Sequence, residues 1–262
     1  MRVAVVMESV HDGTGGFQDA LSKTISLKRA NSSEHEFIVF TPHKKSRDLL
    51  AKEGIKSILF AHRIVRLLDR WSASAIGRAL MRRLRRYGIK RLGRHFDAVL
   101  DDHGIDLVLF TDCGEVGLRL ADHPFIITIW DQFNRDLPEF PEVFTDRQFE
   151  LLERVPSSLL ARAIAVIVDS SAGGHRIAAL YRVDPRRIIE LPFLPSLAVR
   201  RHAQGAGSTT IENLRRKYDL PERYLFYPSF PAPTKNNLYI LDSLVTLERR
   251  HKMKLPVVFC GG

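Results

Sequence analysis

Short apolar runs alternate with longer amphipathic stretches along this chain of 262 residues. The apolar runs are rich in Val, Ile and Phe and lack strict alternation, as is typical of parallel strands that are covered on both faces. They predict strands over residues 3–7, 37–41, 55–60, 105–111, 125–130, 163–169, 188–193, 224–227 and 256–260. The amphipathic stretches predict helices over residues 16–30, 44–53, 64 to about 102, 146–161, 173–181, 210–218 and 237–252. Strands that alternate with helices in this way favour a doubly wound α/β fold.

Residues 196–208 (SLAVRRHAQGAGS) interrupt this alternation. They are small, polar and glycine-bearing, and they follow two prolines, so we interpret them as an interdomain linker. The order of elements predicts a complete Rossmann-like domain over residues 1–195 and the beginning of a second one over residues 209–262. Because two parallel strands leave unpaired edges and an uncovered apolar face, we expect the chain to be a fragment of a longer protein.

The formal net charge of +10 points to an acidic partner, which could be nucleic acid, anionic lipid or a phosphorylated substrate. Residues 78–94 (RALMRRLRRYGIKRLGR) hold eight Lys or Arg side chains and no acid, with apolar residues at near-helical spacing. This segment predicts either a helix packed on the domain core or a membrane contact through Arg82, Arg83, Arg85 and Arg86. Nucleic acid is disfavoured because no RNA-binding signature accompanies the charges.

Neither a membrane-spanning helix nor a signal peptide is predicted. No stretch reaches about 18 uncharged apolar residues, and the apolar N-terminus meets Glu8 before any cleavage-like site. Cys113 and Cys260 each end a strand-like run and predict buried thiols rather than a disulfide. Both observations favour a cytoplasmic protein, with peripheral attachment to the inner membrane face left open.

Three glycines follow the first predicted strand, in HDGTGGFQDAL. Glycine lets a ligand approach backbone N–H groups closely, and the start of a helix favours an anionic group. Gly15 and Gly16 therefore predict either a phosphate or sugar site or a plain tight turn. The stretch is not the GxGxxG dinucleotide fingerprint, because the third glycine is absent and no acid follows the second strand.

Polar side chains follow two further strands. The stretch WDQFNRDLPEFPEVF (130–144) predicts a loop at the carboxyl edge of the sheet, where open α/β sheets bind ligands. Carboxylates, an amide and a guanidinium grip sugar hydroxyls through paired hydrogen bonds; the alternative is a loop that satisfies its own backbone. The candidate residues here are Asp131, Asn134, Arg135, Asp136 and Glu139. In VDSSAGGHRI, Ser170 and Ser171 are candidate N-caps of the next helix.

A third candidate site lies in FYPSFPAPTKNN (226–237), where three prolines stiffen the loop before a predicted helix. Lys235 stands near the start of that helix, where a cation works against the helix dipole at a cost of roughly 0.3–1 kcal/mol. A charge-assisted contact with a diphosphate, worth roughly 1.5–3 kcal/mol, would outweigh this cost. The alternative is an exposed lysine that solvates a turn.

Taken in order, these stretches resemble the GT-B glycosyltransferases of family four, which retain anomeric configuration and use nucleotide sugars. The resemblance rests on GTGGFQDAL, WDQFNRDLPEFPEVF, VDSSAGGHRIAALYRVDPRRIIELPFLPS and LPERYLFYPSFPAPTKNNLYILDSL, and it covers nearly the whole chain. It implies a GT-B-like fold of two Rossmann-like domains, with the acceptor mainly on the first and the donor mainly on the second. The implied acceptor is a lipid-linked glycan or a polysaccharide, and the implied chemistry needs no metal or other cofactor.

The resemblance also implies roles for the candidate residues. Lys235 and Asn236 would hold the donor diphosphate together with Gly15 and Gly16, while Ser170 and Ser171 would contact the acceptor or sugar. The catalytic loop would contribute Asp131, Asn134, Arg135 and Glu139. The chain departs from the family pattern in three ways: no arginine pairs with Lys235, Asn134 replaces a histidine, and the E-x7-E element is not present. We therefore expect this fragment to be inactive by itself; the alternatives are a non-catalytic Rossmann-like binding module and a sugar-nucleotide epimerase.

Overall fold

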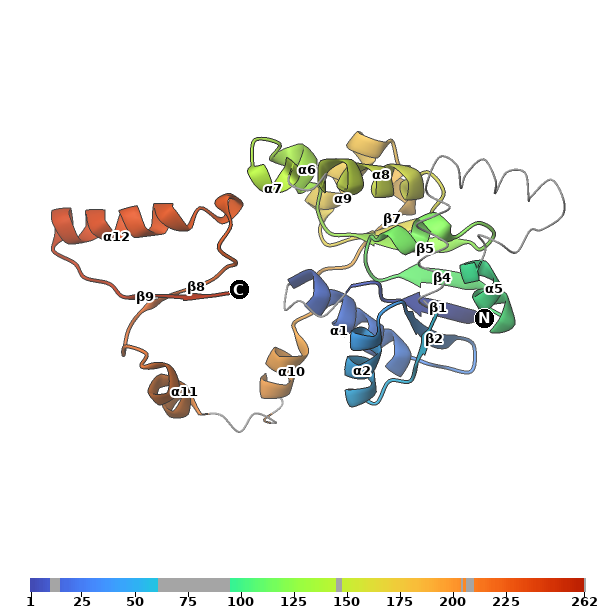
Figure 1. The fold of residues 1–262 in the computed structure, drawn as a ribbon, viewed down its shortest axis with the longest axis horizontal. Helices are drawn as coiled ribbons and strands as arrows, with labels where there is room; N and C mark the ends of the chain where they lie inside the picture. Colours follow the sequence, from blue (N-terminus) through green and yellow to red (C-terminus); the bar gives the residue numbers. More distant parts are fainter. Residues whose placement is uncertain (10–14, 61–94, 145–147, 204, 206–209, 262) are drawn as a thin grey trace. The chain divides into compact units, whose positions relative to one another are not determined.

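The computed structural model describes residues 1–9, 15–60, 95–144, 148–203, 205 and 210–261 (Figure 1). The described chain forms two compact units. Unit 1 comprises residues 1–132 and 153–197, and unit 2 comprises residues 133–152 and 198–262. The basic segment 78–94, with the predicted membrane contacts Arg82, Arg83, Arg85 and Arg86, lies outside the described residues.

Unit 1 is built on a seven-stranded sheet in the order β3-β2-β1-β4-β5-β6-β7, and every neighbouring pair is parallel. The strands are β1 (Arg2–Val6), β2 (Glu36–Thr41), β3 (Ser57–Leu59), β4 (Leu107–Phe110), β5 (Phe125–Ile129), β6 (Ala165–Val168) and β7 (Ile188–Glu190). Each lies within, or within one residue of, an apolar run that predicted a strand. The doubly wound α/β fold is confirmed.

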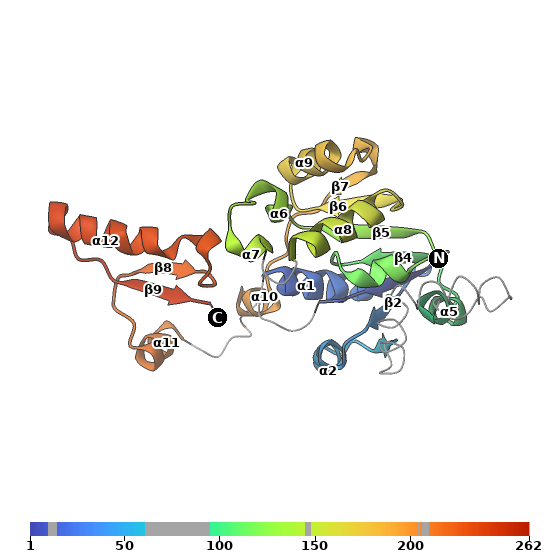
Figure 2. The same cartoon turned by 45° about the horizontal axis from the view of Figure 1, so that its top comes forward.

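Helices cover both faces of this sheet. They are α1 (Gly15–Arg29), α2 (Lys44–Lys52), α5 (His95–Asp102), α8 (Gln148–Leu160) and α9 (Ser171–Tyr181), with the 3-10 turns η1 (Glu115–Arg119) and η3 (Pro185–Arg187). Because parallel crossovers are right-handed, connections that run in opposite directions along the sheet place their helices on opposite faces. Accordingly, α1 and α2 lie on one side and α9 on the other (Figures 1 and 2). Val5, Val39, Phe17, Leu21 and Leu50 are buried together in the core beneath α1 and α2.

Unit 2 contains a two-stranded parallel sheet of β8 (Leu225–Pro228) and β9 (Val257–Cys260), joined through η4 (Pro233–Lys235) and α12 (Asn237–His251). It also contains α6 (Phe133–Asp136), α7 (Pro141–Phe144) and α11 (Ile211–Tyr218). At the end of β9, Gly261 has φ 147°, and a Cβ there would lie 2.7 Å from the Ser229 carbonyl, so close packing requires glycine. This strand–helix–strand unit agrees with the predicted beginning of a second Rossmann-like domain.

Three expectations need correction. The stretch 130–144 is not one open loop, because it contains the short helices α6 and α7. The predicted linker 196–208 contains helix α10 (Leu197–Ala203). Cys113 and Cys260 are both free, as predicted, but neither is fully buried: Cys113 is half-buried, and Cys260 is exposed on a strand that pairs with β8 alone among the described residues.

Candidate functional site

Chemistry-bearing residues gather at the carboxyl edge of the unit 1 sheet. Because all seven strands are parallel, the residues that follow them meet at one edge. Glu8 follows β1, Asp112 follows β4, Asp131 follows β5 and Ser170 follows β6. The strand order reverses between β1 and β4, which is the position where open α/β sheets bind ligands.

Glu8 and Asp112 form a linked pair of carboxylates at this reversal point. The Asp112 carboxylate accepts the Ser9 backbone N–H at 2.6 Å, the Ser9 hydroxyl and, at 3.3 Å, the backbone N–H of Glu8. Glu8 Oε2 accepts the backbone N–H of Val116 at 2.9 Å. Burial, and secondarily the adjacent Asp112, raises the pKa of Glu8 to about 7. A carboxyl group with this pKa can take up and release a proton near neutral pH.

The backbone around the carboxylate pair holds the buried Asp112 beside the half-buried Glu8. A side chain at Gly114 would overlap Glu8, since a Cβ there would lie 2.1 Å from the Glu8 carboxyl carbon. The Ser46 hydroxyl donates to the Ser9 carbonyl at 2.9 Å and fixes the same turn. Burial also raises the pKa of Asp112. Sequence reasoning missed this pair; the available signal was an acid at the end of each of two apolar runs that become adjacent strands.

The two predicted phosphate-site glycines have different surroundings. A Cβ on Gly16 would lie 2.5 Å from Cζ3 of Trp130, so the indole ring packs directly on this residue. A Cβ on Gly15 would meet none of the described residues within 4 Å. Packing therefore explains the glycine at 16, while the open space at Gly15, the first residue of α1, leaves room for a ligand.

The predicted catalytic residues of the 130–144 stretch also differ among themselves. Asp131, Arg135 and Glu139 are exposed, whereas Asn134 in α6 is buried. Within unit 2, a residue that the sequence did not single out has a specific role. Glu142 Oε1 in α7 accepts the backbone N–H of Thr234 at 3.0 Å and its hydroxyl at 2.9 Å, which lowers the pKa of Glu142. This contact fixes the residue next to Lys235.

Ser170 and Ser171 line a pocket of about 150 Å³ at the edge of the sheet. Of the two predicted N-cap candidates, Ser170 is the N-cap of α9, whereas Ser171 is the first residue of the helix. The Ser170 hydroxyl oxygen accepts the Gly173 N–H at 3.2 Å. His175 and Glu190 also line the pocket, beside an apolar wall that includes Ile188. This volume is below that of a typical drug-sized site, so the pocket suits one polar unit of a larger ligand.

Lys235 and Asn236 are exposed in unit 2. The Tyr227 hydroxyl donates to the Lys235 carbonyl at 2.8 Å and anchors the turn on β8. Asn236 is the N-cap of α12 in a left-handed conformation, with φ 49°, and its side chain makes no capping hydrogen bond. The first turn of α12 is therefore not capped by the side chain at its N-cap.

No helix in the described parts of the chain is long and apolar enough to cross a membrane. No group of three or more His, Cys, Asp or Glu side chains in the same residues is placed to hold a metal ion.

Comparisons with solved structures identify the fold. A UDP-N-acetylglucosamine 2-epimerase from Rickettsia bellii matches 99% of this chain at 15% identity, with a TM-score of 0.54 and 61% of its own length covered. A glycosyltransferase from Rickettsia africae matches 100% at 13% identity, with a TM-score of 0.56 and 69% covered. The fold is GT-B-like. The UDP-GlcNAc 2-epimerase from Neisseria meningitidis, solved with UDP-GlcNAc bound, matches 99% at 10% identity, with a TM-score of 0.54 and 65% covered.

The GT-B-like chain thus spans about 61–69% of the length of these three proteins. At these identities the likeness shows the fold alone. No protein-family model matches the chain, and no curated protein matches it.

Proposed function

We propose that this GT-B-like chain is part of a sugar-nucleotide enzyme that transfers a sugar from a nucleotide-sugar donor to a lipid-linked or polysaccharide acceptor, with retention of configuration. The observation that carries the proposal is the set of polar residues at the carboxyl edge of the sheet, in a fold shared with a glycosyltransferase and with an epimerase that binds UDP-GlcNAc. The order of the four sequence stretches supports the glycosyltransferase assignment.

The diphosphate of the donor is assigned to unit 2. Lys235 is exposed and its turn is held on both sides, by Tyr227 through the Lys235 carbonyl and by Glu142 through Thr234. A positioned ammonium stabilises the charge that develops on the departing diphosphate as the bond between it and the anomeric carbon breaks. Asn236 and the exposed first turn of α12 would add N–H donors. In this role the protein groups alone would stabilise the diphosphate, without a metal.

The sugar and the acceptor are assigned to the edge of unit 1 and to the segment that follows β5. Exposed Asp131, Arg135 and Glu139 offer charged groups to sugar hydroxyls. The space at Gly15, where a Cβ would meet no described residue within 4 Å, would admit an anionic group beside Gly16 and Trp130. The pocket with Ser170 and Ser171 would take one polar unit of the acceptor.

A second candidate is a sugar-nucleotide epimerase, and the Glu8–Asp112 pair favours it. Inverting a carbon centre that carries hydrogen requires removal of a proton and its return. Glu8, whose pKa is raised to about 7 by burial and Asp112, is suited to proton transfer at neutral pH. Retaining glycosyl transfer does not require a carboxyl group to remove a proton from carbon and return it.

The test begins with calorimetric titration of the chain with UDP-, GDP- and ADP-sugars, followed by turnover assays on the longest available form. Lys235→Ala should weaken binding of the effective nucleotide sugar about tenfold or more, because a charge-assisted contact is lost. Lys217→Ala, an exposed lysine on α11 in the same unit, is the matched charge control and should leave affinity within about twofold.

Product analysis separates the two reactions. A glycoside that keeps the donor's anomeric configuration supports retaining transfer, an inverted glycoside contradicts retention, and an epimerised nucleotide sugar supports the second candidate. If no nucleotide sugar binds the chain or a longer form, the proposed function is wrong.

A further inference from the structure

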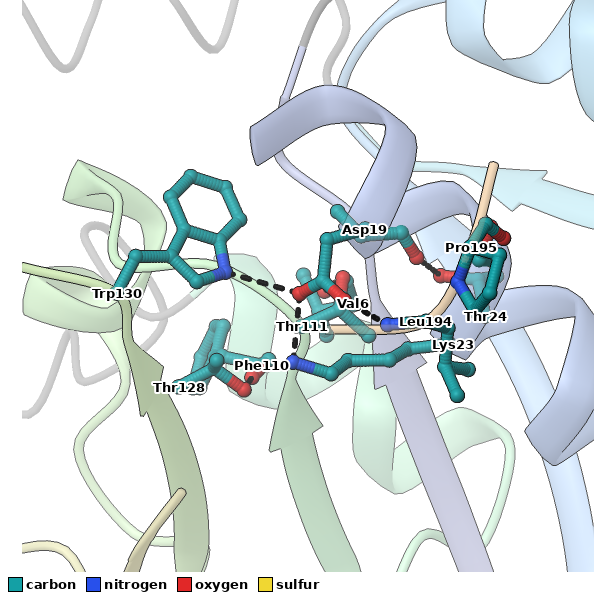
Figure 3. A network of polar contacts seen from close by, with 12 residues as sticks. Val6, Asp19, Lys23, Thr24, Phe110, Thr111, Thr128, Trp130, Leu194 and Pro195 are labelled. Carbon is teal, nitrogen blue, oxygen red and sulfur yellow. Dashed lines mark hydrogen bonds and ion pairs between the residues drawn. The ribbon is translucent and has the colours of Figure 1, made fainter. Parts of the chain in front are cut away.

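A buried carboxylate on α1 connects three separate segments of unit 1. Asp19 is 2% exposed, and its Oδ2 accepts from Lys23 Nζ at 2.6 Å and from Trp130 Nε1 at 3.0 Å (Figure 3). Its Oδ1 accepts the backbone N–H of Leu194 at 3.3 Å. A buried charge is tolerated when its hydrogen-bonding capacity is used, and here the partners come from α1, from the end of β5 and from the segment after β7.

The partner segments are held by further contacts with the same helix. The Trp130 ring packs on Gly16, one turn before Asp19. The Ser22 hydroxyl donates to the Pro195 carbonyl at 3.4 Å. Lys23 Nζ lies 5.6 Å from the centre of the Phe193 ring, within range of a cation–π contact. One face of α1 therefore holds both segments.

Both segments stand where the chain leaves unit 1. Residues 130–132, which we call the first exit, lead into unit 2 at Phe133, and residues 193–197, the second exit, lead into it at Ala198. The remaining crossing lies inside helix α8, between residues 152 and 153. The first exit continues into the stretch with Asn134, Arg135 and Glu139, and the second continues toward Lys235.

We propose that Asp19 is a positioning residue that couples the two exits, so that a displacement of one is transmitted to the other through the shared carboxylate. The proposed substrate-binding residues of unit 2 follow these two exits along the chain, so the coupling would restrain two of that unit's three connections during the reaction. The catalytic consequence rests on the proposed function; the coupling itself is a property of unit 1 and can be tested without turnover.

The experiment is hydrogen–deuterium exchange on the full chain, resolved to the two exits. Asp19→Asn should accelerate exchange at both exits by about tenfold or more, the factor expected when charge-assisted hydrogen bonds are lost. Trp130→Phe removes the indole N–H from the first exit alone. Under the proposal it should also accelerate exchange of the Leu194 amide in the second exit, by about threefold or more.

Asp97→Asn is the matched control. Asp97 is another buried acid, 3% exposed, and it accepts backbone N–H groups from Ala121 at 3.2 Å and from Asp122 at 3.0 Å. It should leave exchange at both exits within about twofold of the parent chain. If Asp97→Asn accelerated amide exchange at the exits as much as Asp19→Asn does, the effect would be general destabilisation and the proposal would be wrong. The proposal would also be wrong if Trp130→Phe accelerated exchange in the first exit only. If Asp19→Asn does not fold, Trp130→Phe alone tests the coupling.

Activity supplies an independent result. If the full-length enzyme turns over a nucleotide sugar, Asp19→Asn should lower kcat at least about tenfold while the KM for the donor changes less, because prealigned groups are lost rather than a contact to substrate. Unchanged kcat would overturn the catalytic role. Absence of turnover in the parent enzyme would overturn the proposed function and leave the exchange result standing.

Discussion

Phe40 in unit 1 and Phe226 in unit 2 occupy similar local positions but differ in burial. Each lies in a parallel strand of an apolar run, Phe40 in β2 and Phe226 in β8. Phe40 is 0% exposed, while Phe226 is 57% exposed. The strand β2 pairs with β1 and β3, whereas β8 pairs only with β9 among the described residues. Local sequence thus decides that a strand forms, and its neighbours decide how much of it is buried.

The same contrast separates the chemistry of the two units. In unit 1, Asp19 and Asp112 are buried and Glu8 is half-buried, and burial raises the pKa values of Glu8 and Asp112. In unit 2 the proposed diphosphate residues Lys235 and Asn236 are exposed. We infer that unit 1 contributes acids held in fixed positions, with Glu8 suited to proton transfer, while unit 2 contributes the exposed positive charge of Lys235.

The largest predicted difference between the two units is in the cost of two truncations, Phe40→Ala and Phe226→Ala. Removing a fully buried phenylalanine leaves a cavity and should lower the free energy of unfolding by about 3–5 kcal/mol. Removing one that is 57% exposed should cost less than about 1 kcal/mol. Urea titrations of the full chain, followed by exchange of amides in each unit, measure both values. Equal costs would mean that Phe226 is covered in solution and would remove the contrast.

The next largest effect is a pH dependence confined to unit 1. The pKa of Glu8 rises to about 7 on folding, from an ordinary value of 4.5, so the folded chain binds a proton that the unfolded chain has released between these values. Stability should therefore fall as pH rises from about 4.5 to about 7 and then level off, by up to about 3 kcal/mol.

Glu8→Gln removes this contribution, because the amide keeps the shape of the side chain and cannot ionise, and it leaves the contribution of Asp112, whose pKa burial also raises. It should make the decline shallower, as measured by urea midpoints between pH 4.5 and pH 8 at constant ionic strength. Glu142→Gln in unit 2 is the comparison variant. In the parent chain, hydrogen bonds to Thr234 lower the pKa of Glu142, so the contribution of Glu142 to stability increases as pH rises, opposite to that of Glu8. Glu142→Gln should remove this increase. A Glu8→Gln profile identical to that of the parent chain would contradict the shifted pKa.

The elements of both units could be predicted from local patterns. Continuous apolar runs predicted each strand of the described residues. Ser170 and Ser171 were both candidate caps because they precede an amphipathic run after a strand, and Ser170 is the cap. The short helices α6, α7 and α10 were missed because one or two turns carry too little periodicity to separate them from a loop.

Contacts between distant segments could not be predicted in this way. Glu8 and Asp112 are 104 residues apart, and they meet only because β1 pairs with β4 across the reversal of strand order. From its neighbours in sequence, Asp19 is expected to be an ordinary polar residue of an amphipathic helix. Its burial depends on Trp130 and Leu194, which lie far from it along the chain. Gly16 was assigned to a ligand, and its closest neighbour is the Trp130 ring.

The smallest predicted difference concerns the caps of α9 in unit 1 and α12 in unit 2. Ser170→Ala removes the acceptor for the Gly173 N–H and should cost about 1 kcal/mol, whereas Ser171→Ala, one residue later, should cost a few tenths at most. Asn236→Gly should change stability by only about 0.5 kcal/mol or less, since Asn236 makes no capping bond and glycine adopts its φ of 49° freely. Amide exchange in the first turns of α9 and α12 measures these differences. If Asn236→Gly proved as costly as Ser170→Ala, the Asn236 side chain would be capping α12 in solution, and the open first turn assigned to the diphosphate would be lost.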